Sequence, residues 1–262
     1  MIFRFPQKHI DDRNIPQLSI NNQNLIYVKF FKFLGLYIDE TLTWNKHMDS
    51  ISLKLTKLSG ILYKLQSFIP QYILKMIYDS LALPHLHFCI GAWGFNNLDR
   101  IKNIQKRLLR TITLSKYNAH TQPLCKQLKT LLIEDIFSLY CMKFYYLHEN
   151  NKLPQYFTHM FFKPTIPKRI VSSKNSHADF LTDTINLRPI ISKEFTNRTL
   201  SQNCIRHTIP KIINSHTFPE LVVNKIYTHS FVSFKKYCKT FLIEKYQATC
   251  NVRNCYVCQQ NE

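Results

Sequence analysis

Glycine is scarce in this sequence. Only 4 of the 262 residues are glycine, whereas about 7% is usual for a globular protein. Neither a GxGxxG nor a GxxxxGK[ST] motif occurs, and these motifs let the backbone approach the phosphates of a bound nucleotide. The sequence therefore argues against a Rossmann fold, a P-loop protein and a turn-rich β-sandwich.

Acidic residues are also few. The chain has 16 Asp and Glu against 35 Lys and Arg, which gives a formal net charge of +19. The basic excess is spread along the chain, because residues 1–162 hold 20 basic and 10 acidic side chains and residues 163–262 hold 15 and 6. This charge favours an acidic partner, above all nucleic acid, over a small-molecule substrate. A basic surface without a particular partner is the alternative.

Long hydrophobic runs are missing, although 45% of the residues are hydrophobic and can build a core. No apolar stretch reaches the ~18–20 residues that cross a bilayer. Residues 1–6 (MIFRFP) are broken by charge and proline, unlike a signal peptide. We therefore expect an intracellular protein, nuclear or cytoplasmic, without a membrane partner. The first five cysteines, at positions 89, 125, 141, 204 and 238, lie in apolar surroundings where reduced, buried thiols are expected.

The hydrophobic periodicity predicts a mainly α-helical chain, a helical bundle preceded by a small antiparallel β segment. Residues 18–28, with asparagines at their turn, and residues 30–39 have strand-like patterns and could pair with each other. From residue 44 the period changes to about 3.6. Helices are expected over residues 44–68, 71–83, 98–114, 123–129, 131–149 and 231–243.

These patterns divide the chain into four predicted parts. Residues 1–39 form a β-rich segment, residues 40–162 a helical domain, residues 163–229 a linker or loosely ordered region, and residues 230–262 a C-terminal helix with a cysteine-containing tail. The third part is set apart by its prolines and its polar stretches.

A row of basic residues is the sharpest local feature. Lys102, Lys106 and Arg110 recur every four residues opposite the apolar stripe of one predicted helix, with Arg107 beside them. Such a row can follow phosphates without reading bases, or it can be a solvated outer face. Residues 41–116 carry 11 basic and 3 acidic side chains, so both interpretations stay open.

Carboxylates arranged for two-metal phosphoryl transfer are not found in the sequence. The pair Asp11-Asp12 lacks a preceding aromatic residue and flanking strands, and we interpret it as part of a surface loop. Glu134-Asp135 falls within a helical pattern and is expected to be an exposed pair. No Ser/Cys–His–Asp arrangement stands out. We therefore predict no catalytic residue in this chain.

Metal-binding signals are weak. Residues 85–95 are nearly uncharged and expected to be buried, so their two histidines, His85 and His87, are interpreted as core or interface residues. Near the C-terminus, three cysteines have spacings compatible with zinc, with His229 or Cys238 as conceivable fourth ligands. These cysteines are Cys250, Cys255 and Cys258. They are only a weak candidate site, and zinc is not expected.

Residues 31–39 (FKFLGLYID) followed by residues 42–48 (LTWNKHM) resemble a non-LTR (LINE-type, jockey- or CR1-like) retrotransposon reverse transcriptase just after its palm domain. Residues 1–30 resemble the end of the palm, and residues 180–225 depart from the family. The likeness continues, and is specific over residues 30–157, in the segments 60–65, 83–86, 91–94, 104–110, 120–124 and 153–157, with a looser match at the helix over residues 231–246.

The resemblance implies a role for each part of the chain. Residues Lys32, Phe33, Leu34 and Gly35 would form the primer-grip hairpin, whose glycine lets the backbone approach a primer terminus. The helices that follow would be the thumb, which holds a template–primer duplex. The nucleic-acid-binding residues would then be those of the hairpin together with Lys54, Lys57, Lys102, Lys106, Arg107 and Arg110.

The implied partner is an RNA–DNA hybrid, or another nucleic acid, recognised by shape. The fingers and the catalytic palm, with its paired aspartates and Mg²⁺, would lie upstream of Met1, so no cofactor is expected in this chain. We therefore expect a polymerase fragment that grips nucleic acid but does not synthesise DNA alone. The alternative is a non-catalytic, retroelement-derived host protein that binds nucleic acid or protein.

Overall fold

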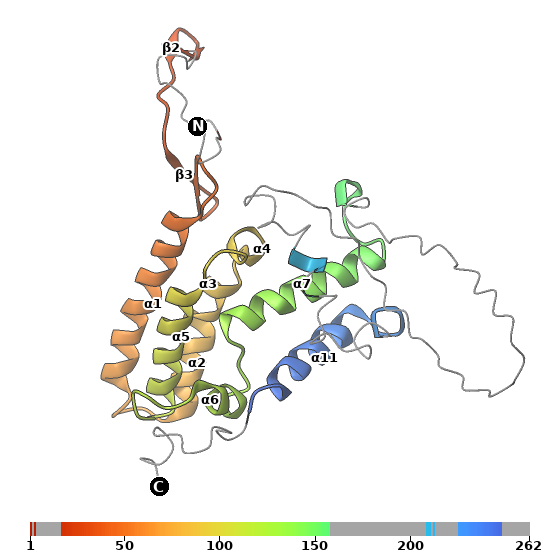
Figure 1. Cartoon of the computed structure of the whole chain (residues 1–262). Coiled ribbons are helices and arrows are strands. Elements are labelled where there is room, and N and C mark those ends of the chain that lie inside the picture. The colour runs from red at the N-terminus through yellow and green to blue at the C-terminus, as the bar shows by residue number, and fades with distance from the viewer. Residues whose placement is uncertain (2, 4–16, 158–207, 211, 213–224, 248–262) are drawn as a thin grey trace, which may run out of the picture. The chain divides into compact units, whose positions relative to one another are not determined.

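The computed structural model describes residues 1, 3, 17–157, 208–210, 212 and 225–247 (Figure 1). These residues confirm the predicted fold class, because two short β-hairpins at the start are followed by helices. The helices with described bounds include α1 (Asn45–Leu65), α2 (Gln71–Leu81), α3 (Leu83–His87), α4 (Ile90–Trp93), α5 (Asp99–Ile112), α6 (Thr121–Gln127), α7 (Ile133–Glu149) and α11 (Phe231–Glu244), with a 3-10 turn, η2, at Gln155–Phe157.

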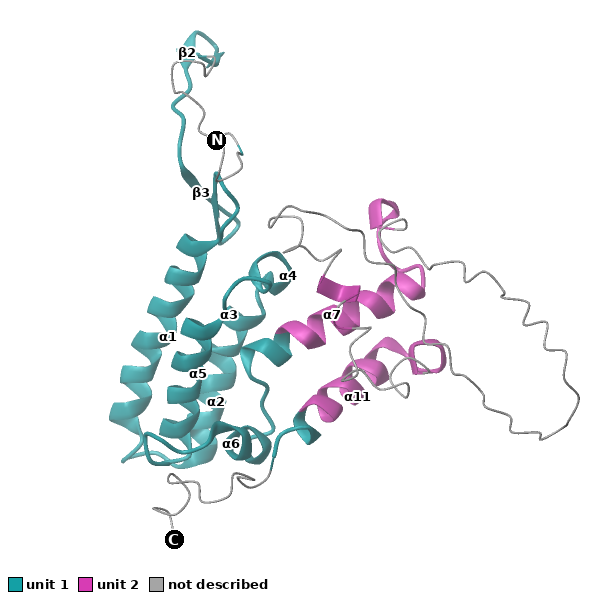
Figure 2. Ribbon diagram, viewed as in Figure 1, with its two compact units in different colours: residues 1–136, 243–262 teal, residues 137–242 magenta. Residues whose placement is uncertain are grey.

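The chain divides into two compact units (Figure 2). Unit 1 comprises residues 1–136 and 243–262, and unit 2 comprises residues 137–242, so the division falls inside α7. The four-part division expected from the sequence stays a prediction, and most of its third part lies outside the described residues.

The two strand-like runs do not pair with each other among the described residues, contrary to expectation. Instead, β1 (Ser19–Ile20) pairs with β2 (Gln23–Asn24), and β3 (Phe30–Phe33) pairs with β4 (Leu36–Asp39), both antiparallel. Each hairpin closes over a two-residue turn, which costs less chain entropy than pairing between the runs. The expected asparagine turn is present, since Asn21 and Asn22 have φ values of 50° and 61°.

The carboxylate of Asp39 joins the second hairpin to α1. Its Oδ1 accepts hydrogen bonds from the backbone N–H groups of Thr41 (3.2 Å) and Thr43 (2.8 Å) and from the Thr41 hydroxyl (3.0 Å). Its Oδ2 accepts from the Trp44 N–H (2.8 Å) and the Thr43 hydroxyl (3.1 Å). Trp44 precedes α1 with a left-handed φ of 61°, a conformation unfavourable for a bulky residue. The carboxylate therefore fixes both the turn and the start of the helix.

His47 adds a second connection at the same place. Its side chain is buried and packs edge-on against Trp93, with the ring centroids 5.7 Å apart. Its Nδ1 accepts a long hydrogen bond (3.5 Å) from the N–H of Tyr37 in β4. The β3–β4 hairpin is thus attached to the helices of unit 1 by Asp39, Trp44 and His47. These three residues belong to the motif that carries the family resemblance.

A buried amide organises the core of unit 1. Gln105 on α5 is 0% exposed, and its Nε2 donates to the Tyr78 hydroxyl (2.8 Å) and to the Leu131 carbonyl (2.9 Å). Its Oε1 accepts from the N–H of Ile133, at the start of α7 (2.8 Å). Three segments are therefore connected through one side chain. The sequence places Leu98, Ile101, Ile104, Leu108 and Ile112 on the inward stripe of this helix, and that expectation missed the buried Gln105 and Leu109.

The nearly uncharged segment 85–95 is not uniformly buried, contrary to expectation. Leu86, Ile90 and Trp93 are buried, but residues 87–89 are exposed, including His87 and Cys89. The reason is that the segment forms two short helices, α3 and α4, and each buries only one face. Proline at the start of α3 begins a new helix there, because its fixed φ suits a first helical turn.

Asp135 was expected to be exposed, but the structure places it in a partly buried position. It is half-buried, accepts a hydrogen bond from the Tyr246 hydroxyl, and has a pKa that burial raises above the ordinary value for aspartate. The Tyr246 hydroxyl in turn accepts from the Leu132 N–H (3.0 Å). Its neighbour Glu134 is exposed and pairs with Lys102 instead.

Three of the cysteines are buried as expected. Burial raises the pKa of Cys125, Cys141 and Cys238 to about 12, so these thiols stay protonated and unreactive at neutral pH. The remaining cysteines after Cys141, at positions 204, 250, 255 and 258, lie outside the described residues.

In unit 2, the predicted apolar face of α11 is buried in part. Phe234 and Cys238 are buried, whereas Phe231 and Phe241 are half-buried. Phe234 packs against Tyr146, with ring centroids 4.7 Å apart, and the Tyr146 hydroxyl donates to the His229 carbonyl (2.7 Å). Aromatic packing thus joins α7 and α11 within this unit.

The buried amide of Gln105 gives a first prediction. Gln105→Met has a similar volume but leaves the Leu131 carbonyl, the Ile133 N–H and the Tyr78 hydroxyl without this partner. We expect the free energy of unfolding to fall by about 2–4 kcal/mol, measured by urea denaturation. Asn103→Met, an exposed change on the same helix, is the control and should stay within about 0.5 kcal/mol of wild type. Equal stability of the two variants would contradict the role given to Gln105.

The Asp39 carboxylate gives a second prediction. All five groups that contact it are donors, so Asp39→Asn would place an NH₂ group against N–H or O–H donors. We expect Asp39→Asn to lose about 1–2 kcal/mol of stability, nearly as much as Asp39→Ala. Asp79→Asn, which removes one partner of an exposed pair with Lys75, is the control. Wild-type stability of Asp39→Asn in urea denaturation would refute the assignment.

Candidate nucleic-acid interface

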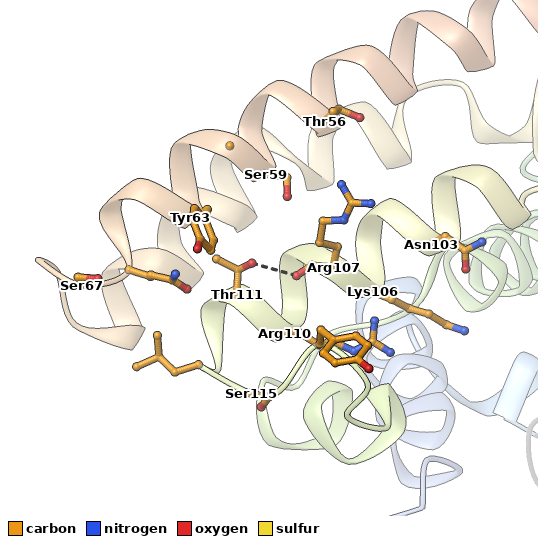
Figure 3. Close-up of a pocket in the computed structure, with 14 residues that line it drawn as sticks. Thr56, Ser59, Tyr63, Ser67, Asn103, Lys106, Arg107, Arg110, Thr111 and Ser115 are labelled. Carbon is orange, nitrogen blue, oxygen red and sulfur yellow. Dashed lines mark hydrogen bonds between the residues drawn. The ribbon is translucent and has the colours of Figure 1, made fainter. Parts of the chain in front are cut away.

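A groove with a volume of about 1360 Å³ lies between α1 and α5 in unit 1 (Figure 3). The residues on the α1 side are uncharged and mostly small, and the α5 side supplies three cations. No acidic residue is among those that line the groove. Its lining residues are Thr56, Ser59, Gly60, Tyr63, Gln66, Ser67, Asn103, Lys106, Arg107, Arg110, Thr111, Leu114, Ser115 and Tyr117.

The groove follows from the residues at the edge of the two apolar stripes. On α1, Leu55, Leu58 and Leu62 are buried in the core. The neighbouring positions on the α5 side carry Thr56, Ser59 and Gly60, whose side chains are too small to fill the space beside the packed helices. The contact between α1 and α5 therefore leaves the groove open along this edge.

The groove cations are not neutralised by carboxylates. Lys106 and Arg107 have no ion pair within the described part of the chain. Arg110 donates from Nε to the Ala119 carbonyl (2.8 Å), which anchors its guanidinium group. Partial burial lowers the pKa of Arg110, but a guanidinium group remains charged at neutral pH. The groove therefore combines positive charge with hydrogen-bond donors.

Carboxylates of unit 1 pair with cations elsewhere. Asp49 pairs with Arg100 and Asp79 with Lys75. Glu134 pairs with Lys102 (2.6 Å). The predicted basic row is thus divided, because Lys106 and Arg110 line the groove with Arg107, whereas Lys102 is held by a carboxylate from α7.

The predicted contacts on α1 lie outside the groove lining. Lys54 and Lys57 are both exposed. Lys54 is two residues before Thr56, or about 200° around the helix. Burial, and secondarily the charge of Lys54, lowers the pKa of His47. The nucleic-acid contacts of both lysines stay predictions.

The hairpin residues form a separate feature. Leu34 and Gly35 make the two-residue turn between β3 and β4, with φ values of 46° and 91°, as a type I′ turn requires. A Cβ atom on Gly35 would lie 3.5 Å from the Phe88 ring, so the close approach at this glycine is to a side chain of unit 1. Lys32 lies over the ring of Tyr37 (5.6 Å). The primer-grip role of this turn stays a prediction.

The hairpin and the groove are well separated along α1. The hairpin is attached next to Trp44, at the start of the helix, and the groove begins at Thr56. Twelve helical residues correspond to ~18 Å. Any single ligand that reaches both must therefore be extended along α1.

The small groove residues Thr56, Ser59 and Gly60 were not predicted as site residues. They gave a signal in the sequence, because small residues recur at helical spacing beside the apolar stripe of α1. That signal became meaningful only when α5, about 50 residues later in the chain, was placed against it.

Neither a metal centre nor a membrane span is found in the part of the chain that the structure describes. No group of three or more His, Cys, Asp or Glu residues there could hold a metal ion, and none of the described helices is long and apolar enough to span a bilayer. The weak zinc candidate, Cys250, Cys255 and Cys258, lies outside the described residues.

The sequence is similar to a known polymerase. It is 26% identical over 130 residues to the RNA-directed DNA polymerase from mobile element jockey of Drosophila funebris, a match that covers 47% of this chain and 14% of that polymerase. No protein-family profile matches the chain, and neither does any solved structure. The chain thus contains a region similar to the reverse transcriptase of a retrotransposon, as its motifs indicated.

Proposed function

We propose that unit 1 binds the sugar–phosphate backbone of a nucleic acid in the α1–α5 groove, as the duplex-gripping part of a retrotransposon reverse transcriptase. One observation carries the proposal. Three cationic side chains line a groove without carboxylates, while carboxylates of the same unit pair with other cations. Similarity to an RNA-directed DNA polymerase supports nucleic acid as the acidic partner.

The groove suits recognition of the backbone better than recognition of bases. Lys106, Arg107 and Arg110 lie within about one turn of α5, a span of ~6 Å. Each strand of a duplex presents one phosphate per ~3.4 Å of helix axis, so these cations can contact two or three successive phosphates. Such contacts give affinity that depends on salt and not on sequence.

Two tyrosines add aromatic side chains to the groove lining, beside its cations. The residues Tyr63 and Tyr117 line it and are 67% and 88% exposed. Aromatic rings of this kind can pack against sugars or stack on bases without sequence preference. The proposal therefore extends to the nucleotides that flank the bound phosphates.

The β3–β4 hairpin belongs to the same proposal. We assign residues Lys32, Phe33, Leu34 and Gly35 to the end of a primer strand, by analogy with the family that the motif resembles. Asp39 and His47 hold the hairpin at the start of α1. A duplex that followed α1 would then meet the hairpin at one end and the groove cations at the other.

The groove cations give a third prediction. In the full chain, we expect Lys106→Gln/Arg107→Gln to bind a 20-base-pair RNA–DNA hybrid at least about tenfold more weakly at 0.1 M salt. The slope of log affinity against log salt should fall by about 1.8, because two phosphate contacts are lost. Fluorescence anisotropy with a labelled hybrid, titrated at several salt concentrations, measures both quantities. Duplex DNA and single-stranded RNA serve as comparison ligands.

The matched control removes the same charge elsewhere in unit 1. Lys126→Gln/Lys129→Gln changes two lysines that do not line the groove, and we expect its affinity to stay within about twofold of wild type. Equal losses in the two double variants would mean that affinity follows net charge alone. Affinity unchanged between 50 and 300 mM salt would likewise reject phosphate contacts.

A further inference from the structure

The hydroxyl of Ser59 has no hydrogen-bond partner in the described part of the chain, and it is not among the buried polar atoms there. Ser59 is only 6% exposed, and it lines the groove. A serine or threonine within a helix commonly donates to the carbonyl four residues earlier, as Thr56 does to Ser52 (2.8 Å). No such bond is made by Ser59, and its side chain is directed from α1 into the groove (Figure 3). The hydroxyl is therefore open to the groove and available to a ligand.

Gly60, the next residue, is a glycine that its surroundings do not require. It lies inside α1, where glycine is less favourable than alanine. Its φ is not in the left-handed region, and a Cβ atom would meet nothing within 4 Å. Neither backbone conformation nor packing therefore explains it. What the missing side chain provides is open space along the wall of the groove.

Arg107 faces this space from the other helix. Its side chain points from α5 toward α1, on the side where Ser59 lies (Figure 3). It is exposed and has no ion pair within the described part of the chain. A guanidinium group forms paired, charge-assisted hydrogen bonds with phosphate oxygens.

We infer that Ser59, Gly60 and Arg107 form a phosphate subsite within the groove. Arg107 donates two hydrogen bonds to a phosphodiester, the Ser59 hydroxyl donates to the same group, and Gly60 lets the strand approach the backbone of α1. The inference rests on the proposed function, because it names the place where the bound backbone comes closest to the protein. A phosphodiester fits since its oxygens only accept hydrogen bonds and both side chains can donate.

Substitutions of Gly60 provide the sharper test, because a side chain at this position should leave the free energy of unfolding unchanged or higher, whereas a large one should weaken binding. Gly60→Ala adds a better helix former at a site with free space, so resistance to urea should stay equal or rise. Gly60→Leu places a larger side chain where the strand would lie, and we expect at least about tenfold weaker binding of the 20-base-pair RNA–DNA hybrid in the full chain. Ser50→Leu adds the same side chain to α1 outside the groove lining and should bind like wild type.

Ser59→Ala tests the hydroxyl. Loss of a hydrogen bond to a charged group should weaken binding by about tenfold. The salt slope should stay as in wild type, because no charge is removed, whereas Arg107→Gln should lower the slope by about 0.9. Ser50→Ala is the matched control on the same helix. Urea denaturation of every variant separates loss of binding from loss of folding.

The outcomes separate the subsite from the proposed function. Wild-type affinity of both Ser59→Ala and Gly60→Leu, with weak binding by Lys106→Gln/Arg107→Gln, would overturn the subsite and leave the groove as the binding site. Wild-type affinity of all these variants would overturn the proposed function itself. Weak binding by Gly60→Leu together with full stability of the folded chain would support the subsite.

Discussion

The three hydrogen bonds of the Gln105 amide fix how α5 is turned about its own axis. The amide faces Tyr78, Leu131 and Ile133 in the core. Successive side chains of a helix are rotated by about 100°, so the inward direction of residue 105 determines where Lys106 and Arg107 point. A core interaction thus sets the positions of the groove cations, although none of its atoms lies at the surface.

The parts of this structure that depend on local sequence could be predicted. The apolar period located the main helices, and the positive charge together with the motif around residues 31–48 indicated a polymerase-like protein. Interactions between distant segments could not be predicted. The pairing of Lys102 with Glu134 joins residues 32 positions apart, and the groove depends on small residues of α1 that acquire meaning only beside α5. Gln105 is polar and was not among the apolar residues expected to face the core, so its burial was not predicted.

The motif that carries the family resemblance has a structural explanation. Asp39 caps the turn, Trp44 adopts a left-handed conformation under that cap, and His47 packs against Trp93. These residues set the angle between the hairpin and α1. The motif thus joins the hairpin to α1 within one short segment of the chain.

The pairing register of the β3–β4 hairpin has a practical consequence for handling the protein. Its paired residues place Phe31, Phe33, Leu36 and Ile38 on one side. The first two are 53% and 54% exposed, and Leu34 at the turn is 79% exposed. A two-stranded hairpin that exposes aromatic residues favours self-association. We therefore expect solubility at high concentration to be limited by this hairpin, despite the large positive charge that keeps the molecules apart.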